Sequence, residues 1–445
     1  MSATATAMQS SEHLLQRLAE ARSRTDELFA IVKPEALYDR PISQRHRIVF
    51  YIGHLESFDW NLLGTRFFGL TSFAPAFDQL FAFGIDPVDR GLPTDQPRDW
   101  PTLEEVARYK RRLRESLDAS LAAFDESASQ TPERRRELAQ LLNVAIEHRL
   151  MHAETLAYML HQLPHHRKSC TGGAPSLLAA PAVPHMVTIP AGSATLGLLR
   201  GADSPFGWDN EFEQHVVDVG AFRIDAYPVT QGDFLRFANE GGYQNRSTWN
   251  DSDWAWLQAS GTKHPAFWVQ RDRQWFQRTM FDEIPLPLDW PVSVSHAEAA
   301  AYARWAGKEL PSEAEWHRAA YGSPQGTERM FPWGDVAPTG SLGNFDFARW
   351  DPTPVGAFPA GASAFGVSDL IGNGWEWTRT EFAPFPGFEA FAFYPGYSAN
   401  FFDGQHYVMK GGSGRTAACM LRRSFRNWFQ PHYPYVYGAF RCVQH

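Results

Sequence analysis

Apolar residues recur at helical spacing through the first 165 residues of the chain. Residues 10–32 and 45–68 each place apolar side chains on one helical face. A third segment begins at Thr102, which has the spacing of a capping box with Glu105, and a fourth begins at Thr131–Pro132 and runs to about residue 163. Four such segments predict a four-helix bundle.

Residues 166–184 differ in character, because basic residues give way to Gly, Ala and Pro, which is typical of a linker. Beyond the linker, the apolar segments are short, aromatic and broken by Gly and Pro. Two helix signals interrupt them, one over residues 295–307 and one that begins at Ser312, where Glu315 completes a capping box. We therefore predict an α+β protein of two domains, a helical bundle over residues 1–165 and a second domain over residues 185–445.

Composition narrows the classes of function. The chain has 445 residues, of which 44% are apolar, so it can bury a substantial core. Its 41 basic and 50 acidic residues give a net charge of −9, which argues against binding nucleic acid through bulk charge. There is no apolar run of membrane-spanning length, no secretory leader, and only three cysteines, too few for a disulfide framework. We expect a soluble cytoplasmic protein without a membrane or nucleic-acid partner.

Two histidines in the fourth helical segment are candidate metal ligands. His148 and His152 are four residues apart, so they share one helical face, and the rest of that face is apolar. Buried imidazoles need partners for both ring nitrogens, and a shared metal ion supplies one. This spacing alone is a weak signal, and a surface pair or hydrogen-bonded core histidines remain alternatives.

A third histidine strengthens the metal hypothesis. His54 lies on the apolar face of the second segment, next to Gly53, which allows another group to approach the backbone closely. Three imidazoles from two helices suit zinc, iron or copper and leave coordination positions for substrate. The alternative is that His54 packs against an aromatic neighbour. Glu154 lies off this face, and we expect a solvated helix glutamate rather than a group that orients a ligand.

The second half of the chain contains several motifs that are recognisable together. They occupy residues 186–192, 206–211, 227–230, 291–295, 305–316, 372–377 and 410–413. This half resembles the formylglycine-generating-enzyme/sulfatase-modifying-factor domain, which implies a C-type-lectin-like fold. Formylglycine-generating enzymes use a copper-binding cysteine pair after the last motif, where this chain has only Cys419. A copper oxidase is therefore disfavoured.

The first half resembles the DinB-like four-helix bundle. Together the two halves resemble the non-heme iron sulfoxide synthases EgtB and OvoA and their selenium relative SenA. The resemblance implies that His54, His148 and His152 bind Fe²⁺ and that Glu154 is the glutamate that follows the last ligand. The implied reaction uses dioxygen to join a thiol to the imidazole of hercynine or histidine, giving a sulfoxide. Holding all reactants on one metal would supply proximity.

The resemblance also assigns a role to a tyrosine of the second domain. Tyr394 matches the residue that donates a proton or hydrogen atom and so favours carbon–sulfur coupling over plain thiol oxidation, and Tyr397 lies beside it. The alternative is that Tyr394 is a loop tyrosine that packs on Phe393.

Residues implied to bind substrate are distributed over both halves. Asn427 and Trp428 match the pair that lines the hercynine site, where an indole ring suits a trimethylammonium group. Phe429 and Tyr433 stand where relatives that use γ-glutamylcysteine have Asp and Arg. Met151 replaces a frequent Gln, and Arg98 is a candidate for binding a carboxylate. Cysteine, γ-glutamylcysteine or a selenosugar all remain candidate donors.

We therefore expect an ergothioneine-type sulfoxide synthase that uses small-molecule substrates and is a monomer or a weak homo-oligomer. A selenoneine synthase and an OvoA-like 5-histidylcysteine sulfoxide synthase are the alternatives within the family. A lectin-like binding protein with a zinc-stabilised bundle is the alternative outside enzymes. The Gly-rich loops of the second domain also suggest a structural Ca²⁺.

Overall fold

The computed structural model describes residues 11–82, 94–126, 130–169, 182–201 and 204–445. The chain divides into two compact units, Met1–Thr171 and Gly172–His445. Most of the linker expected over residues 166–184 lies outside the described residues.

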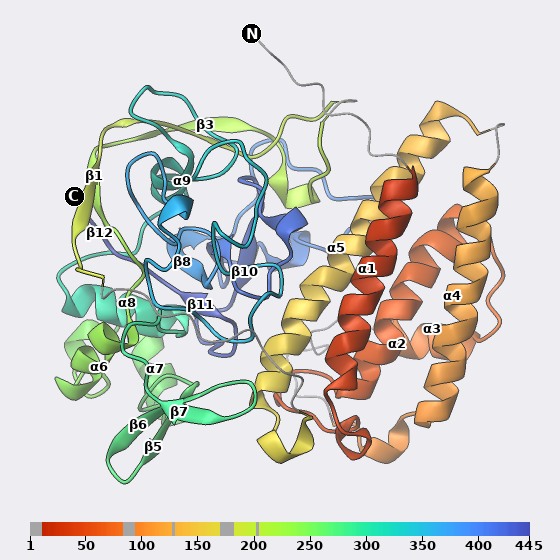
Figure 1. The fold of residues 1–445 in the computed structure, drawn as a ribbon, viewed down its shortest axis with the longest axis horizontal. Coiled ribbons are helices and arrows are strands. Elements are labelled where there is room, and N and C mark those ends of the chain that lie inside the picture. The colour runs from red at the N-terminus through yellow and green to blue at the C-terminus, as the bar shows by residue number, and fades with distance from the viewer. Residues whose placement is uncertain (1–10, 83–93, 127–129, 170–181, 202–203) are drawn as a thin grey trace. The chain divides into compact units, whose positions relative to one another are not determined.

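The first unit is helical, as predicted, and Figure 1 shows its long helices lying alongside one another. The pairs that pack most extensively are α1 with α5 and α2 with α4. Its main helices are α1 (Ser11–Ala30), α2 (Ile48–Asp59), which continues as a π-helix (Trp60–Phe67), α3 (Pro75–Phe81), α4 (Leu103–Asp125) and α5 (Pro132–Gln162). Short 3₁₀ turns lie at Pro34–Ala36, Pro97–Asp99 and His165–Arg167. The four predicted helices are confirmed, and α3 is an addition within the expected loop.

Local chemistry explains where these helices begin and which face they bury. The Thr102 hydroxyl accepts a hydrogen bond from the Glu105 backbone N–H, and the Thr131 hydroxyl accepts one from Arg134. Along α4 the buried side chains recur every three or four residues: Val106, Tyr109, Leu113, Leu117, Leu121 and Phe124. Burying each such apolar side chain contributes roughly 1.5–3 kcal/mol, so this single face accounts for much of the helix's stability.

Over its described residues, the second unit consists of four small sheets with helices and long irregular segments between them. One sheet has the strand order β1 (Met186–Ile189), β4 (Phe222–Asp225), β12 (Val443–Gln444), and another pairs β2 (Gly192–Leu196) with β3 (His215–Val219). A third is the meander β5 (Trp268–Arg271), β6 (Gln274–Arg278), β7 (Glu283–Pro285). The fourth has the order β10 (Asn427–Phe429), β9 (Tyr407–Gly412), β8 (Gly374–Glu381), β11 (Gly438–Ala439).

The helices of this unit are α6 (Gln231–Asn239), α7 (Asp251–Ser260), α8 (His296–Trp305) and α9 (Glu313–Tyr321). The two predicted helices are α8 and α9. The predicted capping box at Ser312 is formed, and Ser295 forms a further one at the start of α8. These outcomes confirm the α+β class expected from the sequence.

A buried ion pair lies in the core beneath α9. The Arg441 guanidinium donates to both Glu376 carboxylate oxygens at 2.6 and 2.7 Å, and Trp316 Nε1 donates to the same carboxylate at 2.7 Å. All three side chains are fully buried. The Trp-Glu-Trp motif around Glu376 is therefore part of the domain's own core.

Candidate metal centre

One ring nitrogen of His54 is fixed by a backbone carbonyl. His54 lies on α2, is buried, and has its Nδ1 atom 2.7 Å from the carbonyl oxygen of Phe81, at the end of α3. A carbonyl can only accept, so Nδ1 carries the proton and Nε2 presents its lone pair. Nε2 has no hydrogen-bond partner among the residues that the structure describes. It is therefore free to bind a metal ion.

Gly53 makes this contact sterically feasible. A Cβ atom at Gly53 would lie only 2.4 Å from the aromatic ring of Phe81. The expectation that a group approaches this glycine closely is confirmed, and the group is the residue whose carbonyl holds His54.

The other two histidines lie on α5 and point to the same place as His54. His148 and His152 are 3% and 2% exposed, which rules out a surface pair. Ring centroids are 4.5 Å apart within this pair, and His54 lies 5.3 Å from His148 and 5.0 Å from His152. One ligand nitrogen from each of the three rings lies within 4.8 Å of the others. The described part of the chain contains no second such group of three His, Cys, Asp or Glu.

The electrostatic surroundings keep these rings neutral. Burial lowers the pKa of His54 to about 4 and holds the pKa of both His148 and His152 well below the usual value. The neighbouring histidines act in the same direction, as does the positive charge of Arg149. The Nδ1 atoms of His148 and His152 are buried and have no hydrogen-bond partner in the described ranges. Three neutral, converging imidazoles with unused nitrogens fit a metal ion that prefers nitrogen ligands.

A buried charge network joins the two helices that carry the histidines. Arg149, on α5, donates from Nε to Asp59 at 2.8 Å, from a terminal nitrogen to Glu56 at 2.8 Å, and to the Leu55 carbonyl at 3.0 Å. Arg114, on α4, reaches Glu56 from the other side at 2.7 Å. The sequence interpretation missed this network, although charged residues inside apolar helical segments are a signal that could have revealed it.

One expectation about this helix is wrong. Glu154 was expected to be a solvated helix glutamate, but it is only 6% exposed. Since α5 is covered along most of its length, residues off the histidine face are also buried. Met151, the residue before His152, is half-buried, whereas Arg98 is exposed in the 3₁₀ turn before α4.

The predicted site residues of the second unit form an aromatic cluster. The ring of Tyr394 lies 5.6 Å from that of Tyr397, and Tyr397 meets Trp428 edge-on at 5.5 Å. Trp428 also stacks on Phe382 at 4.2 Å. Asn427 and Trp428 lie on β10, opposite Met409 and Val408 of β9. The structure therefore brings four predicted residues of this unit together.

Phe429 and Tyr433 form a separate stack. Their rings are nearly parallel, 6° apart in orientation, with centroids separated by 5.5 Å. The two rings contact each other through their apolar faces. The resemblance implies a charged pair at these two positions in relatives that use γ-glutamylcysteine.

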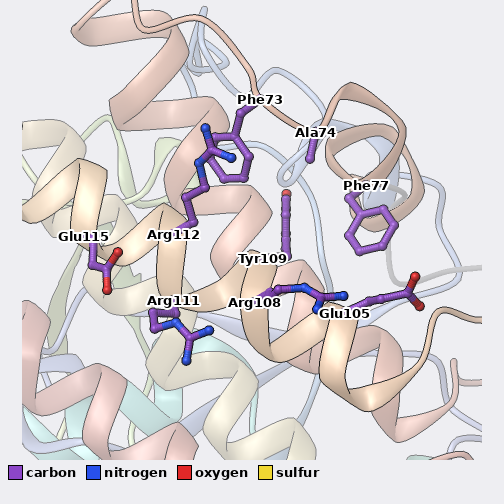
Figure 2. A pocket seen from close by; sticks show the side chains of 9 residues that line it. All are labelled: Phe73, Ala74, Phe77, Glu105, Arg108, Tyr109, Arg111, Arg112 and Glu115. Carbon is purple, nitrogen blue, oxygen red and sulfur yellow. The ribbon is translucent and has the colours of Figure 1, made fainter.

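A pocket of about 470 Å³ lies on the outer face of α3 and α4 (Figure 2). Phe73 and Phe77 line it together with Tyr109 and several exposed arginines of α4. The Tyr109 hydroxyl donates to Asp78 at 2.6 Å. No predicted site residue lines this pocket, so the candidate chemistry lies elsewhere.

Comparison with known proteins supports both domain assignments. Residues 17–156 match the model of the DinB superfamily, and residues 174–445 match that of the sulfatase-modifying factor enzyme 1-like domain. Hercynine oxygenase of Mycolicibacterium thermoresistibile is 35% identical over 97% of this chain and 94% of its own length. Hercynine oxygenase of Mycobacterium tuberculosis is 42% identical over 54% of this chain and 57% of its own length.

A eukaryotic relative extends the range of matches. Ergothioneine biosynthesis protein 1 of Neurospora crassa is 28% identical over 92% of this chain and 55% of its own length. Among solved structures, PvdO from Pseudomonas aeruginosa is 21% identical over 60% of this chain and 99% of its own, with a TM-score of 0.37. In the described residues, no helix combines the length and apolar character that crossing a membrane requires. The chain belongs to the hercynine oxygenase family and joins a DinB domain to a sulfatase-modifying-factor domain.

Proposed function

We propose that this protein is an iron(II)- and dioxygen-dependent sulfoxide synthase that couples a thiol to the imidazole of hercynine, as in ergothioneine biosynthesis. The observation that carries the proposal is the convergence of His54, His148 and His152, three buried neutral imidazoles, in a chain with a full-length hercynine oxygenase relative. An iron ion held by these three nitrogens would supply open coordination positions for both substrates and dioxygen.

The reaction balances without a further reductant. One imidazole C–H bond and one S–H bond break, and one C–S bond and one S–O bond form. The four electrons released reduce dioxygen, of which one oxygen atom remains in the sulfoxide and the other leaves as water.

The residues of the first unit hold the site in shape. The Phe81 carbonyl keeps the proton of His54 on Nδ1, so that Nε2 stays available. Arg149 ties the helix of His54 to the helix of His148 and His152, which fixes the separation of the three rings. Burial keeps water away and all three rings neutral.

We assign the proton donor for coupling to Tyr394, in the half-buried loop that also carries Tyr397. Without this proton, the same dioxygen would convert the thiol to a sulfinic acid, which takes up both oxygen atoms and forms no C–S bond. Trp428 offers its ring to the trimethylammonium group of hercynine, and Asn427 lies beside it.

The donor we favour is cysteine or another donor with no extra carboxylate. Phe429 and Tyr433 stack on one another, and neither carries a charged group that could pair with the carboxylate of a glutamyl group. Arg98 and Met151 stay candidate substrate contacts. Structural Ca²⁺ in the second unit also stays a prediction, which metal analysis tests.

The experiment is incubation of iron-loaded protein with hercynine and, separately, cysteine, γ-glutamylcysteine and a selenosugar, with products identified by mass spectrometry. We expect a sulfoxide of hercynine and oxygen consumption that needs both substrates. Tightly bound zinc with no turnover by the iron-loaded protein would contradict the proposal and support a binding protein instead.

A further inference from the structure

Four consecutive buried residues, Trp208 to Glu211, form what we name the polar turn. All four are at most 1% exposed. The Trp208 backbone N–H donates to the Glu211 side chain at 2.8 Å, and the Glu211 backbone N–H donates to the Trp208 carbonyl at 2.9 Å. The Glu211 carbonyl accepts from the Leu198 backbone N–H at 2.8 Å, which attaches the turn to the segment just after β2. The polar turn is therefore rigidly held.

Trp208 and Asp209, the first half of the polar turn, contact the loop that carries Tyr394. The Ser398 hydroxyl donates to Asp209 Oδ1 at 2.6 Å, and the ring of Trp208 lies 6.4 Å from that of Phe391. Trp208 stacks on Tyr397, with centroids 3.9 Å apart. The polar turn therefore contacts both ends of the eight-residue loop 391–398, through Trp208 at Phe391 and Asp209 at Ser398, and Tyr394 lies between these two points.

Within this loop, the backbone leaves Tyr394 little freedom. Its N–H donates to the Phe391 carbonyl at 3.0 Å, and its own carbonyl accepts from the Tyr397 N–H at 3.2 Å. Two successive turns thus connect the two ends of loop 391–398. A shift of either end would therefore move the Tyr394 side chain.

Asn210 and Glu211, the second half of the polar turn, bind the segment that leads into β10. Glu211 accepts hydrogen bonds from the Arg422 guanidinium and from the Ser424 hydroxyl, the latter at 2.7 Å. The Asn210 carbonyl accepts from Arg426 at 3.3 Å. Residues 422–426 immediately precede Asn427 and Trp428, so the same turn that holds the tyrosine loop also holds the start of the strand with the predicted hercynine contacts.

The polar turn also contains buried polar side-chain atoms that form no hydrogen bond within the described residues. Asp209 Oδ2 and both polar side-chain atoms of Asn210 are buried without a hydrogen-bond partner in the part of the chain that the structure describes. Leaving such groups unpaired destabilises the fold. These unpaired atoms hold neither segment, so the placement of both segments depends on the bonds to Ser398, Arg422 and Ser424.

We propose that the polar turn sets the spacing between the Tyr394 loop and the Asn427–Trp428 strand, and that Asp209 is the positioning residue for Tyr394. This inference rests on the proposed function, because it takes Tyr394 as the proton donor. Glu211 holds the strand and Asp209 holds the loop, so the two placements can be disturbed separately.

The test compares Asp209→Asn and Ser398→Ala with Asp218→Asn, which changes an exposed aspartate on β3 of the same unit. Hydrogen exchange of backbone amides is followed by mass spectrometry for peptides over 391–398 and 424–429. Asp209→Asn replaces the charged acceptor by a neutral amide oxygen and weakens this hydrogen bond, and Ser398→Ala removes it. Removal is expected to speed exchange in 391–398 by about tenfold, and weakening by less. Exchange in 424–429 is expected to stay unchanged, because Glu211 is intact. Ser398→Ala removes the same bond from the loop side, should Asp209→Asn fail to fold.

The second readout is the ratio of sulfoxide to sulfinic acid made by the iron-loaded protein. We expect both loop variants to shift it toward sulfinic acid, less than Tyr394→Phe does, with no shift for Asp218→Asn. Unchanged exchange in 391–398, or an increase spread evenly over the second unit, would overturn the inference. If exchange rises locally while Tyr394→Phe itself leaves the ratio unchanged, the role of Tyr394 is refuted and the hold of Asp209 on the loop stands.

Discussion

The Nε atom of Arg149 lies 2.8 Å from Oδ2 of Asp59, and both side chains are fully buried. Asp59 follows His54 on α2, and Arg149 lies between His148 and His152 on α5. The ion pair therefore connects the two helices that supply the metal ligands, at the level of the ligands themselves.

Removing this connection should be costly. Arg149→Met leaves Asp59 and Glu56 without their shared cation, and breaking a buried pair in this way destabilises a protein by about 3–5 kcal/mol. Urea unfolding measures this loss. Arg136→Met is the control, because Arg136 pairs with Glu133 at an exposed site, where such a pair contributes about 0–1 kcal/mol. Equal losses for the two variants would show that the buried network does not hold the helices together.

Replacing one ligand should abolish iron binding. His152→Ala leaves two imidazoles, and we expect less than one tenth of the iron content of the unchanged protein after identical loading, on the order of the loss that removing a metal ligand or its support causes. Elemental analysis and thermal unfolding with and without metal measure it. His166→Ala, an exposed histidine on the 3₁₀ turn after α5, is the matched control. Normal iron content in His152→Ala would refute the ligand assignment.

Replacing the proposed proton donor should change the product rather than the binding of iron. In Tyr394→Phe we expect thiol to be converted to sulfinic acid and little sulfoxide to form, because the coupling step lacks its proton. Mass spectrometry of the products, with iron content measured in parallel, checks both halves of this expectation. Tyr227→Phe, in another loop of the same unit, is the control, and an unchanged sulfoxide yield in Tyr394→Phe removes that tyrosine from the mechanism.

The contact between Gly53 and Phe81 gives a steric prediction. A methyl group at Gly53 would overlap the Phe81 ring, and overpacking of this kind costs about 1–3 kcal/mol. Gly53→Ala should therefore lower stability and also weaken metal binding, because the displaced Phe81 carbonyl no longer holds His54. Gly220→Ala, where the added atom meets nothing within 4 Å, should leave metal affinity unchanged. Metal titration of both variants measures this difference in metal affinity.

The metal-free protein should lose stability as the pH falls. In the unfolded chain His54 takes up a proton near its ordinary pKa of 6.5, whereas in the folded protein its pKa is about 4. The unfolded state therefore binds more protons between these values, and the free energy of unfolding falls from pH 6.5 toward pH 4, by about 1.4 kcal/mol per unit of pKa difference. His148 and His152 add to this trend, since their pKa is also lowered. Urea unfolding at pH 7.5 and pH 5 measures the difference.

The His54→Asn variant provides the control for that measurement. It lacks one of the three histidines whose pKa is lowered, so its stability should depend less steeply on pH over the same interval. An identical pH dependence in both proteins would show that His54 is accessible to protons in the fold.

Local sequence patterns determined much of this protein. A Thr or Ser precedes each of α4, α5, α8 and α9. Its hydroxyl accepts a hydrogen bond from the backbone N–H three residues later, and this marks where the helix begins. The common face of His148 and His152 follows from helical geometry, and the inward orientation of His54 from the apolar residues around it. Each of these features depends on residues within one or two helical turns, so spacing along the chain is sufficient to find them.

Tertiary structure alone decided the rest. The Phe81 carbonyl on His54, the hold of Arg149 on Glu56 and Asp59, the burial of Glu154, and the grip of Asp209 on Ser398 could not be read from spacing. Arg149 and Asp59 are 90 residues apart, and Asp209 and Ser398 are 189 apart. Sequence shows which side chains can donate or accept, but which of them meet depends on how distant elements pack, and burial then makes those few contacts strong.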